Sequence, residues 1–404
     1  MAKIFKMVGA KTMKILHTVE SYPPSLGGMQ EVVKQLSERL VKLGHEVTVA
    51  TSANADRTDS IVNGVNIKEF NISGNMVRGM VGDVAAYQKY VLDSDYDVIT
   101  NFAAQQWATD ALLPIIGQLK MKKVFVPTGF SGLYWPEYKQ YFESMKTWIK
   151  QYDANVFLSD DYRDINFARE CKVKNDILIP NGACAEEFTT SSNIDIRNQL
   201  GIPDNHFLIL HVGSHTYYKG HGEAIRIFHQ AKVTNATLLI VGNTFSSGGC
   251  TKLCNLRKHV FSLLPQRLVD RKKVIITELS RADTIAAYHA ADLFLFPSNI
   301  ECSPIVLFEC MASKTPFLTT DVGNALEIIT WSNAGVALPT IKTDTGYSKA
   351  DINKSAKVLE EIFKDDDKRN EMRSAGFKAW QDRFTWQKIA LDYERLYYDL
   401  IAKG

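Results

Sequence analysis

The chain has 404 residues, which is long for a single core and suits two domains. Hydrophobic residues make up 45% and charged residues 23%, a globular composition that excludes a disordered or collagen-like protein. The 47 lysines and arginines against 45 acidic residues leave a net charge of +2, so we expect no nucleic-acid partner.

The sequence favours a cytoplasmic protein. It contains no run of about 18 apolar residues that would cross a membrane. Residues 1–12 lack the long apolar core of a secretory signal, and Met13 begins a cleaner first strand, so residues 1–12 are left out of the expected fold. The six scattered cysteines do not suggest a disulfide framework, which favours a reducing compartment.

The first half of the chain alternates short apolar runs with amphipathic segments. The run at 14–19 predicts a buried strand, and a loop with Gly27 and Gly28 follows it. Apolar residues then recur every three or four positions between 32 and 43, which predicts a helix. Parallel sheets are built from such units. Further strands are predicted at 46–50, 96–100, 122–126, 155–159 and 177–179.

The second half repeats this rhythm after a polar stretch at 183–205, which is a predicted linker. A helix is expected at 222–232, and a final amphipathic helix begins at Trp386. The chain is therefore predicted to be an α/β protein with two facing doubly wound, Rossmann-like domains. Ligands of open parallel sheets bind beyond the carboxyl ends of the strands, so the cleft between the domains is the expected site. Strands of this half are predicted at 207–212, 237–241, 274–277 and 293–296.

The strongest cluster of functional residues follows the predicted strand at 293–296. Ser303 and Pro304 form a typical helix start, in which serine caps the helix and proline takes its first position. The amides of the next residues, Ile305 and Val306, would then form an anion site suited to a diphosphate. Glu301 and Glu309 flank this start and are suitable acceptors for sugar hydroxyls.

Two weaker signals lie at other predicted strand ends. Lys219 lies in the loop after the strand at 207–212, where a point cation could face a diphosphate. Gly27 and Gly28 lie between the first strand and its helix, and glycines allow a backbone to approach a ligand closely. Taken alone, an exposed lysine and a plain turn would explain both.

Together these motifs resemble glycosyltransferase family 4, the retaining nucleotide-sugar transferases of the GT-B fold. The resemblance covers nearly the whole chain from Met13. Its most specific element is the pair Glu301 and Glu309, separated by seven residues. It also rests on Lys219-Gly220 and on Ala291-Asp292. In the first half it is looser and depends on Gly27-Gly28 and the loop at 22–24.

The resemblance implies a role for each part of the chain. Residues 13–185 should form the acceptor-binding domain, and residues 186–385 should bind the nucleotide sugar. Residues 386–404 should form a helix that packs back on the first domain. The donor is expected to be UDP-linked, with UDP-glucose favoured, and no cofactor is expected beyond this substrate.

The resemblance also implies roles for single residues. Glu309 should accept hydrogen bonds from the ribose, and Glu301 from the donor sugar. Lys219 should hold the diphosphate with the amides of the helix start. Glu301, Lys219 and Thr128 are the expected catalytic residues. The donor is further expected to be bordered by Gly27, Gly28, Ser214, His215, Asn243, Leu279, Ser280, Ser303, Pro304, Ile305 and Val306.

Two positions depart from the family pattern. Ser214 stands where an arginine usually contacts the diphosphate, and His215 is a partial substitute for it. Thr128 stands where the family often has a histidine near the donor sugar. A threonine can donate and accept hydrogen bonds, but it does not titrate near neutrality.

No metal site is predicted. Asp93, Asp95 and Asp97 precede a strand and are explained by turn chemistry. The histidines at 211 and 215 show no third ligand, and the cysteines at 250 and 254 lack a partner pair. A dinucleotide-dependent dehydrogenase is disfavoured because Gly220-His221-Gly222 lacks the third glycine of the fingerprint.

The sequence therefore predicts a retaining, metal-independent glycosyltransferase. Its acceptor is expected to be a glycan or a lipid-linked glycan, and Tyr134 and Trp135 could reach either an acceptor or a membrane surface. A peripheral contact with the inner face of the membrane therefore stays open. Two other functions also stay open: a GT-B-like sugar-nucleotide epimerase, and a non-catalytic nucleotide-sugar-binding partner.

Overall fold

The computed structural model describes residues 11–25, 27–190, 193–243, 249–263 and 270–403. The chain divides into two compact units. Unit 1 comprises the residues up to Asn181 together with those from Trp386 onward, and unit 2 runs from Gly182 to Thr385. The boundary between them lies a few residues before the expected one at 185/186.

Unit 1 is built on an eight-stranded sheet in the order β10-β9-β8-β7-β1-β2-β4-β3. Adjacent strands of this sheet are parallel, except that β3 runs antiparallel to β4. The chain reverses its direction of strand addition between β1 and β7, which is where doubly wound sheets bind ligands. The strands are β1 (Lys14–Thr18), β2 (Glu46–Ser52), β3 (Ile61–Val62), β4 (Val65–Phe70), β7 (Val98–Phe102), β8 (Lys122–Val126), β9 (Ala154–Phe157) and β10 (Asp176–Leu178).

Helices and a small hairpin surround this sheet. One core of unit 1 is rich in aromatic side chains, among them the fully buried Tyr87, Trp107 and Phe125. The helices are α1 (Gly28–Lys42), α2 (Val84–Leu92), α3 (Trp107–Asp110), α4 (Lys139–Trp148) and α5 (Arg163–Glu170), and the hairpin joins β5 (Ile72–Asn75) to β6 (Gly79–Gly82).

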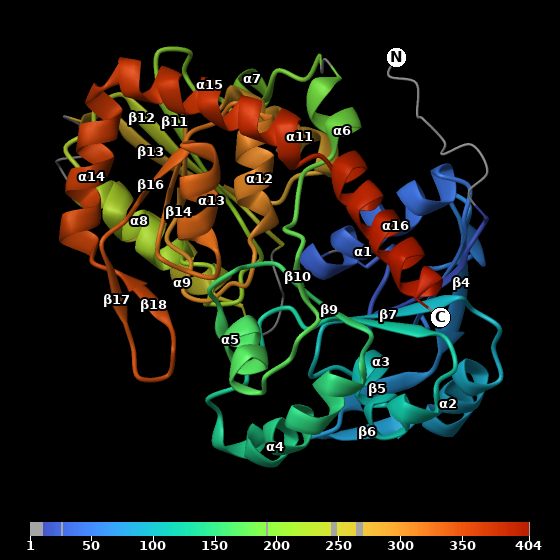
Figure 1. The fold of residues 1–404 in the computed structure, drawn as a ribbon. Helices are drawn as coiled ribbons and strands as arrows, with labels where there is room; N and C mark the ends of the chain where they lie inside the picture. Colours follow the sequence, from blue (N-terminus) through green and yellow to red (C-terminus); the bar gives the residue numbers. More distant parts are fainter. Residues whose placement is uncertain (1–10, 26, 191–192, 244–248, 264–269, 404) are drawn as a thin grey trace. The chain divides into compact units, whose positions relative to one another are not determined.

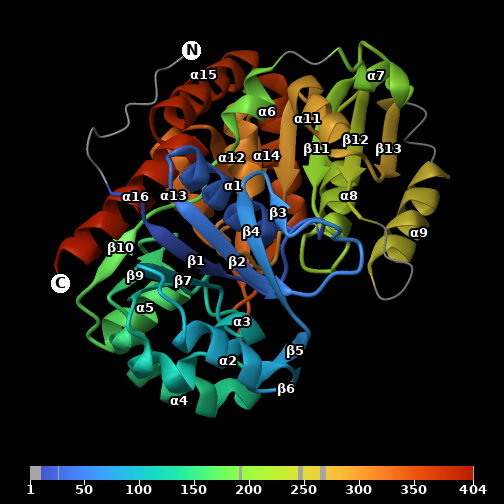
Figure 2. The same ribbon diagram turned by 90° about the vertical axis from the view of Figure 1, so that its right-hand side faces the viewer.

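The last helix, α16 (Trp386–Ala402), belongs to unit 1 and lies alongside α1 (Figures 1 and 2). Its buried face includes Tyr393 and Tyr397. The Tyr397 hydroxyl lies 2.7 Å from Oγ1 of Thr100 and 3.2 Å from Nε2 of His17. Nδ1 of His17 lies 2.8 Å from the Ser37 hydroxyl, so one buried polar network joins α16 to β1, β7 and α1.

Unit 2 contains a six-stranded parallel sheet in the order β13-β12-β11-β14-β15-β16. This is the Rossmann order, and the direction of strand addition reverses between β11 and β14. A separate hairpin joins β17 (Thr340–Lys342) to β18 (Ser348–Ala350). The six strands are β11 (Phe207–Val212), β12 (Ala236–Val241), β13 (Lys272–Thr277), β14 (Leu293–Phe296), β15 (Phe317–Thr319) and β16 (Gly335–Ala337).

Helices cover both faces of this sheet (Figure 1). Alternate residues of β11 separate the two cores: Leu208 and Leu210 pack with α11 and α12, whereas Ile209 packs with α8 and α14. The bridge between Ala183 and Thr385 brings the two ends of unit 2 together. The helices are α6 (Ala185–Thr189), α7 (Ile196–Gln199), α8 (His221–Gln230), α9 (Thr251–Ser262), α11 (Arg281–Ala290), α12 (Ile305–Ala312), α13 (Ala325–Ser332), α14 (Ile352–Lys364) and α15 (Asp366–Arg383).

Candidate active site

The candidate site of unit 2 lies where the loops after β11 and β14 meet. The loop after β11 ends at Gly220, whose φ of 76° is left-handed. A Cβ at Gly220 would lie 2.0 Å from the Pro297 carbonyl oxygen, so only glycine allows the two loops to approach this closely. The Asn299 amide donates a hydrogen bond to the Tyr218 carbonyl at 2.7 Å, which also joins the two loops.

Lys219 and Glu301 are bound to each other across these loops. The Lys219 ammonium donates to both carboxylate oxygens of Glu301, at 2.7 and 2.9 Å. The Ser298 hydroxyl donates to Oε1 of the same carboxylate at 2.8 Å. Two residues that are 82 positions apart are thus brought to one point at the carboxyl ends of adjacent strands. A cation and an acceptor for hydroxyls lie side by side there.

The segment after β15 packs against the loop that follows β14. Gly323 has a left-handed φ of 54°, and a Cβ there would lie 2.2 Å from the Cys302 carbonyl oxygen. The Asn324 amide donates to that carbonyl at 2.8 Å. The Asn324 side chain also donates to the hydroxyl of Ser303 at 3.1 Å. The loop at 301–303 is therefore supported from behind.

The start of α12 differs by one residue from the expectation. Pro304 is the cap residue, with φ −69° and ψ 111°, and Ile305 is the first helical residue. The expected cap, Ser303, accepts a hydrogen bond from the Asn324 side chain, and the proline at the cap position has no side-chain group that could accept one from α12. The reason is that the backbone of Pro304 is extended, so Pro304 does not form the first turn of the helix. Ile305 and Val306 are half-buried at this helix start.

Glu309 lies on α12 and is buried, as 5% of its surface is exposed. The Arg281 guanidinium lies with Nη1 2.6 Å from Oε1 of Glu309 and with Nη2 2.5 Å from Oε2 of Glu187. Burial lowers the pKa of Arg281, but the two carboxylates raise it by more, so it stays charged. Arg281 was not predicted from the sequence, where its one signal is its place beside the predicted site residue Ser280.

Leu279 and Ser280 precede α11, and Asn243 follows β12. Leu279 packs partly buried against the core. The Ser280 hydroxyl accepts from the Asp283 amide at 3.1 Å and caps α11. These residues, like Lys219 and Glu301, follow the carboxyl ends of strands in one parallel sheet. Ser214 lies in the loop after β11 and is half-buried.

His215 is fully buried, and its Nδ1 lies 3.3 Å from Sγ of Cys250. Its ring stacks on that of His221, with centroids 4.1 Å apart. The structure thus places His215 in the protein interior, where it contacts side chains rather than solvent. The proximity of Cys250 to His215 could not be predicted from the sequence, because 35 positions separate the two residues.

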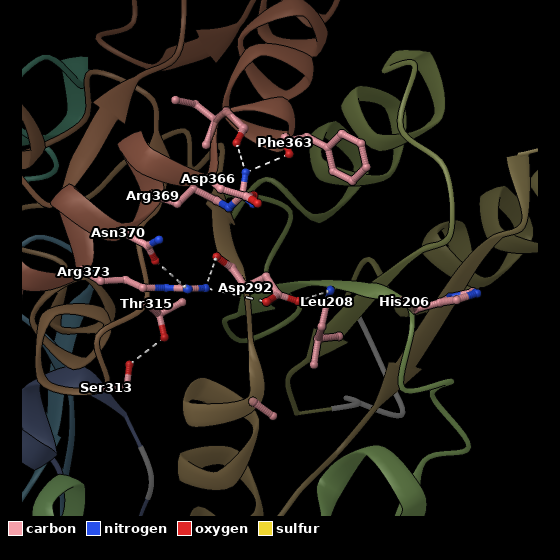
Figure 3. A network of polar contacts seen from close by, with 12 residues as sticks. His206, Leu208, Asp292, Ser313, Thr315, Phe363, Asp366, Arg369, Asn370 and Arg373 are labelled. Atoms are coloured by element: carbon pink, nitrogen blue, oxygen red, sulfur yellow. Dashed lines mark hydrogen bonds and ion pairs between the residues drawn. The ribbon is translucent and has the colours of Figure 1, made fainter.

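Asp292, part of the motif Ala291-Asp292, directly precedes β14 and so lies at the amino ends of the strands, whereas Lys219 and Glu301 follow the carboxyl ends. Figure 3 shows Asp292 beside Leu208 and Arg373. Its carboxylate accepts from the Leu208 amide at 2.8 Å and from the Arg197 guanidinium at 3.1 Å. It also forms an ion pair with Arg373 at 3.6 Å. Leu208 is the second residue of β11 and Leu293 the first residue of β14, so Asp292 joins α7 and α15 to the amino ends of these strands and is structural.

In unit 1, Thr128 lies in a strained loop after β8. Thr128, Gly129 and Phe130 all have left-handed φ values, of 59°, 96° and 46°. A β-branched residue in this region is an outlier that persists only where the surroundings hold it. The buried carboxylate of Asp164 accepts from the Gly129 amide at 2.8 Å and fixes the loop. Strain of this kind is frequent at ligand sites.

Gly27 and Gly28 lie at the start of α1, in the connection that follows β1. Gly27 has φ 165°, which is extended backbone that any residue adopts. The conformation of Gly27 therefore does not require glycine. Since β1, β7 and β8 are parallel neighbours, their following loops lie at one edge of the sheet of unit 1.

Two family models match the chain. The model described as Glycosyltransferase Family 4 matches residues 26–186, and the model described as Glycosyl transferases group 1 matches residues 192–379. The chain is a GT-B glycosyltransferase of the family 4 type. It is therefore an enzyme that transfers sugar residues. The two models cover Thr128 in unit 1 and Lys219, Glu301 and Glu309 in unit 2.

Known proteins resemble this glycosyltransferase along much of its length. An uncharacterized glycosyltransferase of Methanocaldococcus jannaschii is 26% identical over 387 residues, which cover 87% of this chain and 94% of that protein. The lipopolysaccharide 1,2-N-acetylglucosaminetransferase of Salmonella typhimurium is 22% identical over 253 residues, 60% of this chain and 61% of that protein. The structure of Anabaena HepE with UDP-glucose matches with a TM-score of 0.71 and 17% identity, covering 96% of this chain and all of that one.

Within the described ranges, no helix is both long and apolar enough to cross a membrane.

Proposed function

We propose that this glycosyltransferase transfers glucose from UDP-glucose to a glycan or lipid-linked glycan, with retention of anomeric configuration. The observation that carries the proposal is the Lys219–Glu301 pair at the switch point of unit 2. The fold shared with HepE, whose structure contains UDP-glucose, supports this choice of donor. The similarity to a lipopolysaccharide N-acetylglucosaminetransferase supports a role in glycoconjugate biosynthesis.

In the proposed reaction, the bond between the anomeric carbon and the diphosphate oxygen breaks, and the acceptor oxygen bonds to that carbon from the same face. Lys219 exchanges its contact with Glu301 for the diphosphate and stabilises the charge that develops there. Glu301 then accepts a hydrogen bond from a sugar hydroxyl. The departing phosphate oxygen takes the acceptor proton, so no protein base is needed.

The acceptor is proposed to enter a pocket of unit 1. This cavity of about 420 Å³ lies between the 133–146 segment and α5. The Arg163 guanidinium lies 5.2 Å from the centre of the Tyr134 ring, which is 59% exposed. Aromatic faces beside charged side chains are suited to sugar rings. Its lining includes Tyr134, Trp135, Lys139, Glu143, Arg163 and Glu170.

A donor screen tests the choice of nucleotide sugar. A ligand at 100 times its dissociation constant stabilises the folded state by about 2.7 kcal/mol. UDP-glucose should therefore raise the thermal midpoint more than GDP- or ADP-sugars at equal concentration. A larger shift with another base would overturn the assignment of UDP.

Activity measurements test the reaction itself. Purified enzyme should release UDP from UDP-glucose when a suitable glycan acceptor is supplied, and the product should carry an α-linkage by NMR. Lys219→Ala should abolish most of this turnover, whereas the exposed Lys349→Ala on β18 should not. Binding of UDP-glucose without transfer or hydrolysis would indicate a non-catalytic protein, and interconversion of the free donor would indicate an epimerase.

The transfer is proposed to need no magnesium or manganese, because Lys219 and the amides at the start of α12 supply the positive charge. Activity should therefore be unchanged when millimolar magnesium or manganese is added to, or left out of, the assay. A requirement for either ion would contradict this mechanism.

A further inference from the structure

Three buried side chains from separate segments of unit 2 meet beside the loop after β11. His215 lies in that loop, His221 is the first residue of α8, and Cys250 immediately precedes α9. Their exposed fractions are 0%, 1% and 4%. Each offers one nitrogen or sulfur atom, and these three atoms all lie within 4.8 Å of one another. Their chemistry is that of metal ligands.

The hydrogen bond of His221 fixes which of its nitrogens can bind an ion. Nε2 lies 2.9 Å from the carbonyl oxygen of Gly213, which can only accept, so Nε2 carries the proton. Nδ1 then has a free lone pair, and it lies 3.8 Å from Sγ of Cys250. Histidines that bind metals commonly donate their other ring N–H to a backbone carbonyl in this way.

The separations between these atoms match those around a tetrahedral zinc ion. Zinc lies about 2.3 Å from a cysteine sulfur and about 2.05 Å from a histidine nitrogen, so a tetrahedral arrangement separates the two ligand atoms by about 3.6 Å. The Sγ of Cys250 lies 3.3 Å from Nδ1 of His215 and 3.8 Å from Nδ1 of His221. The two distances bracket the expected value.

The surroundings of this cluster are also buried. The ring centroids of His215 and His221 lie 4.1 Å apart. Cys254 lies one helical turn after Cys250 and is fully buried.

We propose that His215, His221 and Cys250 bind one zinc ion, supported by Cys254. Imidazole and thiolate ligands together are typical of zinc. The ion joins the loop after β11 to the start of α8 and α9. His215 and His221 lie on either side of Lys219, so the ion fixes the shape of the segment that presents this lysine. Its role is structural, and it takes no part in the transfer step.

Cobalt binding to the wild-type protein tests the site without relying on a variant. Metal-free protein titrated with Co²⁺ should bind one ion per chain and show a thiolate-to-cobalt absorption band, which one equivalent of Zn²⁺ should remove. Protein purified in zinc-containing buffer should also retain about one zinc per chain after desalting. Absence of both the band and the zinc would overturn the proposal.

Variants assign the ligands. Cys250→Ser and His221→Ala should each lower zinc affinity by more than the about 100-fold that loss of a supporting residue costs at most, and Cys250→Ser should remove the cobalt band. Cys254→Ser should weaken zinc binding less, because loss of a supporting residue typically costs about 10- to 100-fold in affinity. Cys171→Ser, a buried cysteine of unit 1, is the matched control and should bind zinc like wild type. Equal zinc affinity in Cys250→Ser and wild type would overturn the proposal.

Discussion

The Arg281 guanidinium lies 2.6 Å from the carboxylate of Glu309 and binds Glu187 on its other side. Glu309 is 5% exposed, so the charge that is expected to hold the ribose is balanced within the protein before any ligand arrives. An ion pair of this kind orients the carboxylate, which Arg281 contacts through Oε1.

Arg281→Ala should weaken UDP binding by about 10- to 100-fold, because hydrogen bonds to charged groups contribute about 1.5–3 kcal/mol. If Arg281 acts by orienting Glu309, adding this change to Glu309→Ala should have little further effect. Titration calorimetry on the two single variants and the double variant measures this. Arg226→Ala, an exposed arginine of α8, is the control. Fully additive losses would show that Arg281 binds UDP independently of Glu309.

Glu309→Ala and Glu301→Ala should separate the two parts of the donor. Loss of Glu309 should weaken the binding of UDP itself. Loss of Glu301 should weaken the binding of UDP-glucose and leave the affinity for UDP nearly unchanged. The physical reason is that Glu301 neutralises Lys219 in the free enzyme, so its removal leaves the lysine available to phosphate. Calorimetry with both ligands decides this, and equal losses of UDP affinity would contradict the division of roles.

Thr128 should position a substrate hydroxyl rather than titrate. Thr128→Ser should retain most activity, and Thr128→Val should lose about 1–3 kcal/mol of transition-state stabilisation for one unmade hydrogen bond. No ionisation of residue 128 should appear in the dependence of rate on pH. A Thr128→Val variant with wild-type rates would show that this loop does not face the sugar.

The buried Asp164 makes the stability of unit 1 depend on pH. Burial raises the pKa of this carboxyl from its ordinary 3.8 to about 6. The folded chain therefore binds this proton more tightly than the unfolded chain does. The stability that results from this tighter binding is lost as the pH rises through about 6. The free energy of unfolding of Asp164→Asn should therefore rise relative to that of wild type by up to about 3 kcal/mol between pH 4 and 7.

Thermal unfolding midpoints recorded across this pH range measure the effect of Asp164→Asn. The comparison with wild type matters because buried His17 has a pKa lowered by burial to about 3 and contributes a pH dependence of the opposite sign to both proteins. The exposed Asp176→Asn is the control. A constant difference between Asp164→Asn and wild type at every pH would contradict the prediction.

Tyr397→Phe should destabilise unit 1 by about 1–3 kcal/mol, because it leaves Thr100 and His17 without their shared buried partner. Tyr398→Phe on the same helix removes an exposed hydrogen bond to the Lys11 carbonyl and should stay within about 0.5 kcal/mol of wild type. Urea unfolding of both variants tests this. Equal losses of unfolding free energy in the two variants would show that burial of the Tyr397 network adds nothing to stability.

Much of the fold could be predicted because its buried strands are short apolar runs. The runs at 122–126 and 207–212 coincide with β8 and β11. By contrast, β4 (Val65–Phe70) was missed because it lies near the edge of the sheet, and its exposed polar residues Asn66, Lys68 and Glu69 interrupt both an apolar run and a strict alternation. β15 and β16 have only three residues each, too few for a periodic signal.

The site was only partly predictable. Glu301 and Lys219 each follow a strand, so their common edge could be inferred from the β-α-β pattern, although their direct contact could not. Arg281 was missed because ion pairing depends on which helices are neighbours. The grouping of His215 with Cys250 was missed for the same reason, since nothing in the spacing of these residues indicates that α9 begins beside the loop after β11.

The order of the two units along the chain has a consequence for biosynthesis. Unit 2 lies wholly between the main part of unit 1 and its last helix, α16. At about 5–20 residues per second, the ribosome needs on the order of 10–40 seconds to synthesise unit 2. During that interval His17 and α1 lack the helix that covers them, so we expect nascent chains released before residue 386 to be captured by chaperones or proteases.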